Sequence, residues 1–136
     1  MRYRRLILSI AIISIATIFA FVDVSAAKHE LLGQPLPEFT QQSPEDWLNS
    51  SPLKLENLKG QVLVVDFWTF GCWNCYNSFP WLNTLQEKYV DKPFKVIGVH
   101  RPEFPHERDR VKVAEKTKEF NLQHPVMIDN EFGYWK

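Results

Sequence analysis

The sequence predicts an α/β domain in which helices cover a parallel β-sheet. Three apolar segments have the length and composition of strands, at residues 62–68, 94–100 and 125–128. The first is an unbroken run of β-branched and aromatic residues, which is typical of a strand buried on both faces of a parallel sheet. Segments with helical periodicity separate the three strands, and this alternating order implies right-handed crossover connections.

The two helices are predicted from the spacing of their apolar side chains. Residues 77–89 place an apolar stripe on one helix face, and Pro80 within it is expected to kink the helix. Residues 107–121 return to the helical period. The stripe of the first helix comprises Cys75, Phe79, Leu82, Leu85 and Tyr89, and that of the second comprises Val113, Thr117 and Phe120.

Residues 28–61 are predicted to be an irregular lead-in, because four prolines interrupt them. Apolar side chains in this stretch are expected to anchor it to the core. They are Trp47, Leu48, Leu53, Leu55 and Leu58.

Composition bounds the classes of protein that this chain can be. With 136 residues it has the length of about one domain, which excludes a multidomain enzyme. Its formal net charge of zero gives no electrostatic basis for binding nucleic acid. Two cysteines are too few for a disulfide scaffold or a four-thiolate zinc site.

Residues 1–27 have the composition of a targeting segment and not of a globular domain. A basic head precedes an apolar run at residues 6–22, and small residues follow it. This order is typical of a secretory signal peptide, while the length of the run lies at the lower limit for a membrane anchor. Either interpretation exports residues 28–136, so we expect a periplasmic or extracytoplasmic domain.

Cys72 and Cys75 form the strongest chemical motif in the sequence. They lie three residues apart where the first strand gives way to a helix. At a helix N-terminus, free backbone N–H groups and the helix dipole favour the thiolate of the first cysteine. The second cysteine falls on the apolar stripe and should be less exposed. This asymmetry suits a redox pair in which Cys72 attacks a disulfide and Cys75 resolves the mixed disulfide.

Other uses of two cysteines are weaker interpretations. A structural disulfide across so short a loop would stabilise the fold little. A zinc site needs two more ligands, and the histidines have no compact ligand spacing. Haem attachment needs a histidine directly after the second cysteine, where Tyr76 stands. We therefore expect neither a metal nor another cofactor.

The motif resembles the active-site stretch of the thioredoxin superfamily. Asp66 lies six residues before the first cysteine and Pro80 five after the second, as in that family. The segments 55–62 and 67–69 resemble the extracytoplasmic TlpA/ResA-like branch. Further segments, at residues 74–75, 98–100 and 102–104, are similar to the thioredoxin-like domain of DipZ-type cytochrome c biogenesis proteins. The resemblance implies a thioredoxin-like fold and thiol–disulfide exchange.

The resemblance also implies roles for residues around the cysteines. Asp66 would be a buried carboxyl that moves protons to and from Cys75, the alternative being a solvent-exposed aspartate at a strand end. Aromatic residues crowd the motif, and we expect some of Trp73, Trp68 and Phe70 to form an apolar rim that receives a substrate's disulfide, with Trp73 the better exposed candidate. His100 is interpreted as structural. The expected partners are proteins bearing disulfides or thiols and a membrane redox partner.

In the thioredoxin family a cis-proline loop, a hairpin and a final helix follow the third strand. Nothing after Trp135 matches them, so the domain is expected to lack these elements, as a truncated product or with a partner supplying a strand. The hairpin-pairing edge of the strand at 62–67 would then stay unpaired. A non-catalytic binding module, and a copper- or zinc-binding thiol protein, remain the alternative functions.

Overall fold

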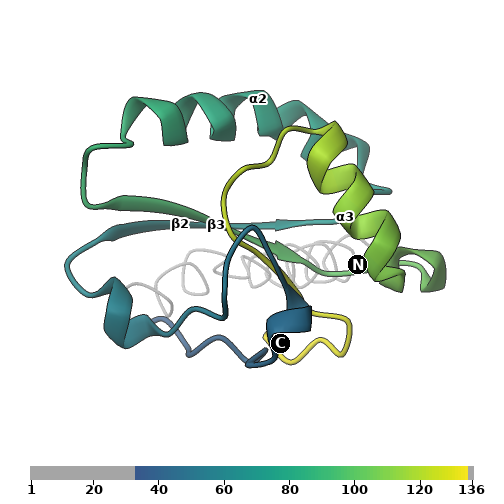
Figure 1. The fold of residues 1–136 in the computed structure, drawn as a ribbon, viewed down its shortest axis with the longest axis horizontal. Coiled ribbons are helices and arrows are strands. Elements are labelled where there is room, and N and C mark those ends of the chain that lie inside the picture. The colour runs from purple at the N-terminus through teal and green to yellow at the C-terminus, as the bar shows by residue number, and fades with distance from the viewer. Residues whose placement is uncertain (1–32, 135–136) are drawn as a thin grey trace, which may run out of the picture. The chain divides into compact units, whose positions relative to one another are not determined.

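The computed structural model describes residues 33–134, and residues 37–134 form one compact unit around a four-stranded sheet (Figure 1). The strand order is β1–β4–β3–β2. The strands are β1 (Trp47–Leu48), β2 (Val62–Trp68), β3 (Phe94–His100) and β4 (Val126–Ile128). β2, β3 and β4 are parallel, and β1 is antiparallel to β4. The parallel α/β architecture predicted from the sequence is confirmed.

Helices α2 (Trp73–Lys88) and α3 (Arg110–Glu119) pack on one face of the sheet (Figure 1). Phe79 and Leu82 of α2 and Val113 of α3 are buried in one cluster with alternate residues of the strands. Those strand residues are Trp68, Val96, Val126 and Ile128. Because side chains alternate between the two faces of a sheet, Val64, Asp66 and Trp68 of β2 all face this layer.

The opposite face of the sheet is covered by the segment that precedes β2. Phe39 packs edge-on against Trp47, at 5.5 Å between ring centroids, and stacks on Tyr134 at 5.3 Å. Trp47 and Leu58 are buried, as expected of anchors, with Leu53 and Leu55 packed against the same cluster. Leu48, the remaining anchor, packs from β1 against the cluster on the helix side.

The prediction of a wholly irregular lead-in was wrong for part of residues 33–61. Trp47–Leu48 forms β1, and short 3₁₀-helices lie at Pro44–Asp46 and Leu55–Leu58. β1 is only two residues long and pairs with residues far along the chain, at Val126 and Met127. A local pattern carries no signal for such a pairing.

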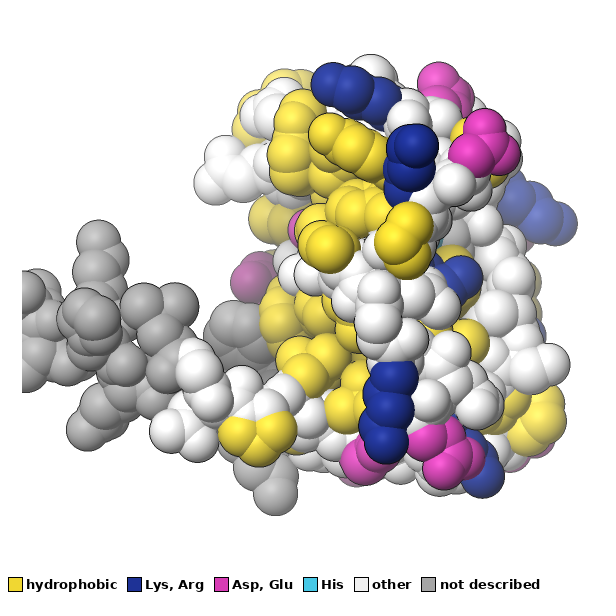
Figure 2. Space-filling view, turned by 90° about the vertical axis from the view of Figure 1, so that its left-hand side faces the viewer, with side chains coloured by type: hydrophobic (Ala, Val, Ile, Leu, Met, Phe, Trp, Pro, Cys, Tyr) yellow, Lys and Arg dark blue, Asp and Glu magenta, His cyan; other side chains and the backbone are white. Residues whose placement is uncertain are grey.

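Strand β2 is less buried than its composition predicted. Within residues 33–134 it pairs with β3 alone, from Val62 opposite Phe94 to Trp68 opposite His100. Its five middle residues are half-buried and Val62 is 64% exposed, so burial on both faces was a wrong prediction. The expected unpaired edge of this strand is present in the described part of the chain. Figure 2 looks onto the end of the molecule where β2 and β3 begin, and apolar side chains there are interrupted by charged ones.

The helix boundaries also differ from those predicted. α2 begins at Trp73, not at residue 77, because Cys72 caps it. The second predicted helix is divided into a 3₁₀-turn, η4 (Pro105–Arg108), and α3, because Asp109 starts a new helix. The Asp109 carboxylate accepts hydrogen bonds from the N–H groups of Val111 and Lys112.

None of the helices in residues 33–134 is long and apolar enough to cross a bilayer. The predicted signal peptide or anchor at residues 1–27 lies outside the described residues.

Candidate active site

Cys72 occupies the N-cap of α2, directly after the turn that leaves β2. Its sulfur accepts a hydrogen bond from the backbone N–H of Cys75 at 3.2 Å, and its own N–H donates to the carbonyl oxygen of Thr69 at 3.2 Å. A capping side chain satisfies one of the free N–H groups at a helix start. The sulfur of Cys72 therefore lies where the helix favours negative charge.

Cys72 and Cys75 are joined by a disulfide, with their Cα atoms 5.3 Å apart. Both residues are partly exposed. Cys75 also packs against the cluster of Phe79 and Leu82, which places it on the inner side of the pair. The structure places Cys72 at the helix tip and Cys75 one turn inward, whereas the lower exposure expected of Cys75 stays a prediction.

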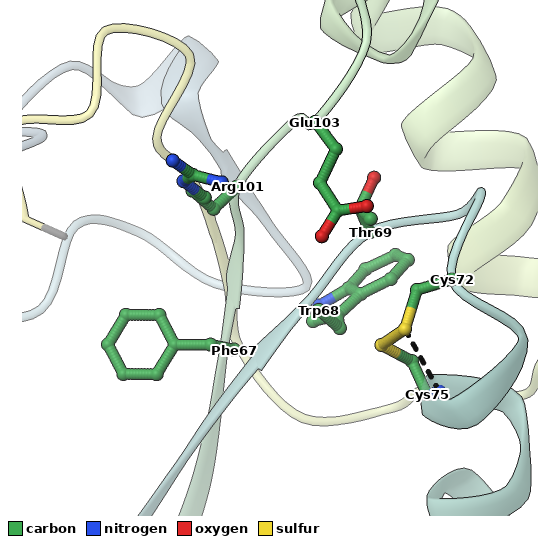
Figure 3. A pocket seen from close by; sticks show the side chains of 7 residues that line it. All are labelled: Phe67, Trp68, Thr69, Cys72, Cys75, Arg101 and Glu103. Atoms are coloured by element: carbon green, nitrogen blue, oxygen red, sulfur yellow. Dashed lines mark hydrogen bonds between the residues drawn. A yellow bond between two sulfur atoms is a disulfide. The ribbon is translucent and has the colours of Figure 1, made fainter.

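A pocket of about 180 Å³ lies beside the disulfide (Figure 3). The end of β2 forms its floor, the cysteines form one wall, and the loop after β3 forms another. The lining residues are Phe67, Trp68, Thr69, Cys72, Cys75, Arg101 and Glu103. In Figure 3 the Trp68 indole lies next to the disulfide, whereas Phe67 points away from it. A sulfur of an incoming thiol or disulfide could approach through this pocket.

Asp66 lies on the helix-covered face of β2, opposite Gly98 of β3. Its Oδ2 atom is buried and has no hydrogen-bond partner among the described residues. Burial raises the pKa of this carboxyl above its usual value. These properties agree with a buried proton acceptor and not with an exposed strand-end aspartate. Its part in catalysis stays a prediction.

The three aromatic residues expected at the substrate rim differ sharply in exposure. Trp73 is 74% exposed between the two cysteines. Trp68 is buried and reaches the site only as part of the pocket, and Phe70 is buried in the core. The Tyr76 hydroxyl donates a hydrogen bond to the backbone carbonyl oxygen of Phe70, which holds the backbone of Phe70 in place. An exposed rim is therefore present at Trp73 but not at Trp68 or Phe70.

His100 is fully buried, and its Nδ1 atom has no hydrogen-bond partner among the described residues. That its role is structural stays a prediction. Its ring stacks on Phe70 and meets Trp68 edge-on, and Nε2 lies 3.5 Å from the Thr69 hydroxyl. Desolvation lowers the pKa of His100 to about 4 against the opposing effect of the Glu107 charge. The imidazole is therefore neutral at physiological pH.

Two further buried polar residues were not singled out by the sequence analysis. Glu107 is fully buried in η4, and His124 is buried before β4 with both ring nitrogens unpartnered within the described residues. The local sequence around Glu107 and His124 does not predict their burial, because tertiary packing alone removes these side chains from solvent. No group of three or more His, Cys, Asp or Glu side chains in residues 33–134 is arranged to hold a metal ion.

A model of the Redoxin family matches residues 31–134. The chain belongs to the Redoxin family. Protein DipZ of Mycobacterium bovis is 34% identical over 92 residues, which are 65% of this chain and 13% of DipZ. Thiol-disulfide oxidoreductase YkuV of Bacillus subtilis is 28% identical over 100 residues, 74% of this chain and 66% of YkuV. These matches confirm the resemblance to the DipZ and TlpA/ResA-like proteins.

The structural comparison agrees with this Redoxin assignment. The solution structure of a thioredoxin-like protein in its oxidised form matches with a TM-score of 0.65 and 29% identity, over 74% of this chain and 66% of that chain. The thioredoxin-like fold is thereby confirmed. Several curated relatives are far longer, and the chain spans only 11 to 14% of their length.

Proposed function

We propose that this Redoxin-family protein is a thiol–disulfide oxidoreductase that exchanges disulfides with protein substrates through Cys72 and Cys75. The observation that carries the proposal is a disulfide whose first sulfur caps α2 beside an accessible pocket. The similarity to YkuV, which is itself named a thiol-disulfide oxidoreductase, supports it.

The exchange proceeds in two steps. In the dithiol form, the Cys72 thiolate attacks one sulfur of a substrate disulfide, forming a mixed disulfide and releasing the other substrate sulfur as a thiolate. The Cys75 thiolate then attacks the Cys72 sulfur, which closes the Cys72–Cys75 disulfide and releases the second substrate sulfur. Two electrons pass from the protein to the substrate, and the reverse sequence oxidises a substrate dithiol.

Asp66 is the proposed proton acceptor for Cys75 in the second step. A carboxyl whose pKa is raised by burial is a stronger base near neutral pH than an exposed one. In the reverse direction the protonated carboxyl returns the proton to the leaving Cys75 sulfur.

Trp73 is the proposed contact for the polypeptide around the substrate disulfide. It is the large apolar side chain exposed between the two cysteines, and an exposed indole supplies contact area at low entropic cost. Trp68 contributes the floor of the pocket.

The composition of residues 1–27 supports export of the domain, by a cleaved signal or an anchor at residues 6–22. A membrane redox partner would then renew the dithiol. The intact mass of the protein isolated from its native cells would test whether residues 1–27 are removed.

Reduction of insulin disulfides with dithiothreitol as electron donor tests the activity. Cys72→Ser should abolish the protein's acceleration of the reaction. Cys75→Ser, first reduced and then freed of dithiothreitol, should trap a mixed disulfide with insulin that gel analysis without reductant detects. Asn77→Ser, an exposed position on the same helix, is the matched control and should leave the rate unchanged. Activity that survives Cys72→Ser would reject the proposed function.

A further inference from the structure

Glu107 is a buried carboxylate in the loop that connects β3 to α3. Its side chain is fully buried, and Oε2 accepts hydrogen bonds from the backbone N–H groups of Glu103 at 2.7 Å and Phe104 at 2.8 Å. Burial alone would raise the pKa of Glu107, but polar neighbours, foremost the backbone N–H groups of Phe104 and Glu103, outweigh it and lower the pKa. Oε1 is buried and has no hydrogen-bond partner among the described residues. The group is therefore ionised at neutral pH.

The other carboxylate oxygen lies against the turn that leads into Cys72. A Cβ atom built on Gly71 would overlap Oε1 of Glu107. The φ angle of Gly71 is not in the left-handed region, so its backbone conformation does not demand glycine. A side chain at position 71 would therefore have to displace the carboxylate of Glu107.

Glu107 thereby connects two loops on either side of the pocket. One loop contributes Glu103 to the pocket lining, and the other holds Cys72 through the hydrogen bond from its N–H to the Thr69 carbonyl oxygen. The proposed function uses neither carboxylate oxygen of Glu107. The two backbone donors to Oε2 lie in the loop of Glu107 itself, so the link to the other loop is the close packing of Oε1 against Gly71.

We infer that Glu107 is a positioning residue for the redox pair, and that its buried carboxylate stabilises the Cys72–Cys75 disulfide relative to the dithiol. Two physical effects act in the same direction. The packing of Oε1 against Gly71 restrains the turn that precedes Cys72 and so keeps Cys72 close to Cys75, which raises the effective concentration of one sulfur at the other. The negative charge of the Glu107 carboxylate lies against Gly71, the residue that precedes Cys72, and disfavours the Cys72 thiolate that forms on reduction. The inference rests on the proposed function in one respect, namely that the pair is redox-active.

The equilibrium with glutathione tests this role. Two glutathione thiols reduce the protein disulfide and become one oxidised glutathione, with two electrons and two protons passing to the cysteines. We expect Glu107→Gln to be half-reduced at a [GSH]²/[GSSG] ratio roughly three- to tenfold lower than the wild-type chain, where tenfold corresponds to about 30 mV. Glu115→Gln, an exposed carboxylate on α3, is the matched control and should stay within twofold of wild type.

A merely structural role predicts a different result. In that case Glu107→Gln would lower the thermal midpoints of the oxidised and reduced forms equally, and the glutathione equilibrium would not move, because it depends only on the difference between the two forms. An unchanged equilibrium would overturn the inference. Since no protein substrate takes part, this result is distinct from loss of insulin reduction in Cys72→Ser.

Gly71→Ala tests the same contact from the other side and serves if Glu107→Gln does not fold. The added methyl group displaces the carboxylate from the turn, so the disulfide should again become easier to reduce, by at least about threefold on the same scale. An equilibrium within twofold of the wild-type value in this variant would overturn the inference as well.

Discussion

The backbone N–H of Cys75 donates a hydrogen bond to the sulfur of Cys72 over 3.2 Å, so the two sulfurs of one disulfide have unequal surroundings. The Cys72 sulfur lies at the positive N-terminal end of α2 and accepts this hydrogen bond, whereas Cys75 supplies the N–H donor. Donors aimed at a sulfur stabilise its thiolate after reduction.

This inequality predicts that Cys72 is the faster nucleophile of the reduced protein. At pH 7, iodoacetamide should modify Cys72 at least about tenfold faster than Cys75. Peptide mass spectrometry after brief labelling measures both rates. Equal labelling, or faster labelling of Cys75, would contradict the assignment of the attacking residue.

Trp73→Ala should weaken the reaction with protein substrates without weakening the fold. The indole is 74% exposed, so its removal should change the free energy of unfolding by less than about 0.5 kcal/mol. We expect kcat/KM for insulin to fall about three- to tenfold, since an exposed aromatic contact contributes on the order of 1 kcal/mol to recognition. Trp81→Ala, 59% exposed further along α2, is the control. Equal losses in both variants would argue against a specific role for Trp73.

Asp66→Asn should stabilise the oxidised protein at neutral pH while slowing its reaction. Because burial raises the folded-state pKa of Asp66, the wild-type chain loses stability as pH rises through the interval between the unfolded and folded pKa values. Asparagine cannot ionise, so the variant should be more stable than the wild-type chain at pH 7, and this gain should shrink as pH falls toward the unfolded-state pKa of aspartate. Urea unfolding at both pH values measures it.

Insulin reduction provides the second measurement on Asp66→Asn. Loss of the proton acceptor should slow turnover at least about tenfold. Asp91→Asn, an exposed carboxyl after α2, should show neither effect. A stability gain with unchanged turnover would remove Asp66 from the mechanism.

His124 should make the protein sensitive to mild acid. Desolvation lowers the pKa of His124 to about 4, so between about pH 6.5 and pH 4 the unfolded chain binds a proton that the folded chain excludes. Stability is therefore lost as pH falls through this interval, by up to about 1.4 kcal/mol per pH unit for each such histidine. His100 contributes in the same sense.

His124→Leu should flatten this pH dependence by roughly half, since His100 remains. Both ring nitrogens of His124 are buried without hydrogen-bond partners in the described part of the chain. Replacement by leucine therefore leaves no neighbouring group without a partner that the ring had supplied. Unfolding free energies measured at half-unit intervals from pH 4 to 7 provide the check. A slope identical to that of the wild-type chain would show that His124 is not buried neutral.

Gly98→Ala should destabilise the protein although the φ angle of Gly98 is not left-handed. A Cβ atom there would lie 3.0 Å from Trp68 Nε1 and 3.2 Å from His124 Nε2. Overpacking of this kind typically costs about 1–3 kcal/mol. Denaturant unfolding of the variant measures the cost, and unchanged stability would mean that the Trp68 and His124 rings can move apart.

The two long strands could be predicted to the residue, whereas the helix starts could not. Segments rich in β-branched and aromatic residues define 62–68 and 94–100 by composition alone. The start of α2 depends on a sulfur acting as a cap, and that of α3 on the Asp109 carboxylate. Such caps consist of one or two hydrogen bonds, to which the periodicity of apolar residues is insensitive.

In the candidate site, too, some features could be predicted from the local sequence and others could not. The spacing and position of Cys72 and Cys75 predicted their chemistry, because a strand–helix junction has local consequences for a thiol. The exposure of Trp68 and Phe70 has no such local cause, since it depends on whether α2 and the loop after β3 cover them. Glu107 became visible only when two loops distant in sequence were brought together.

The stacking of Phe39 on Tyr134 determines where this polypeptide can be cut without damage. A fragment that began at Val62 would contain every parallel strand and both cysteines, yet Ile97, Val99 and Met127 would lose Phe39, Trp47 and Leu58, which now cover them. A fragment that keeps this layer on the sheet therefore has to begin at or before Pro37, where the compact unit starts.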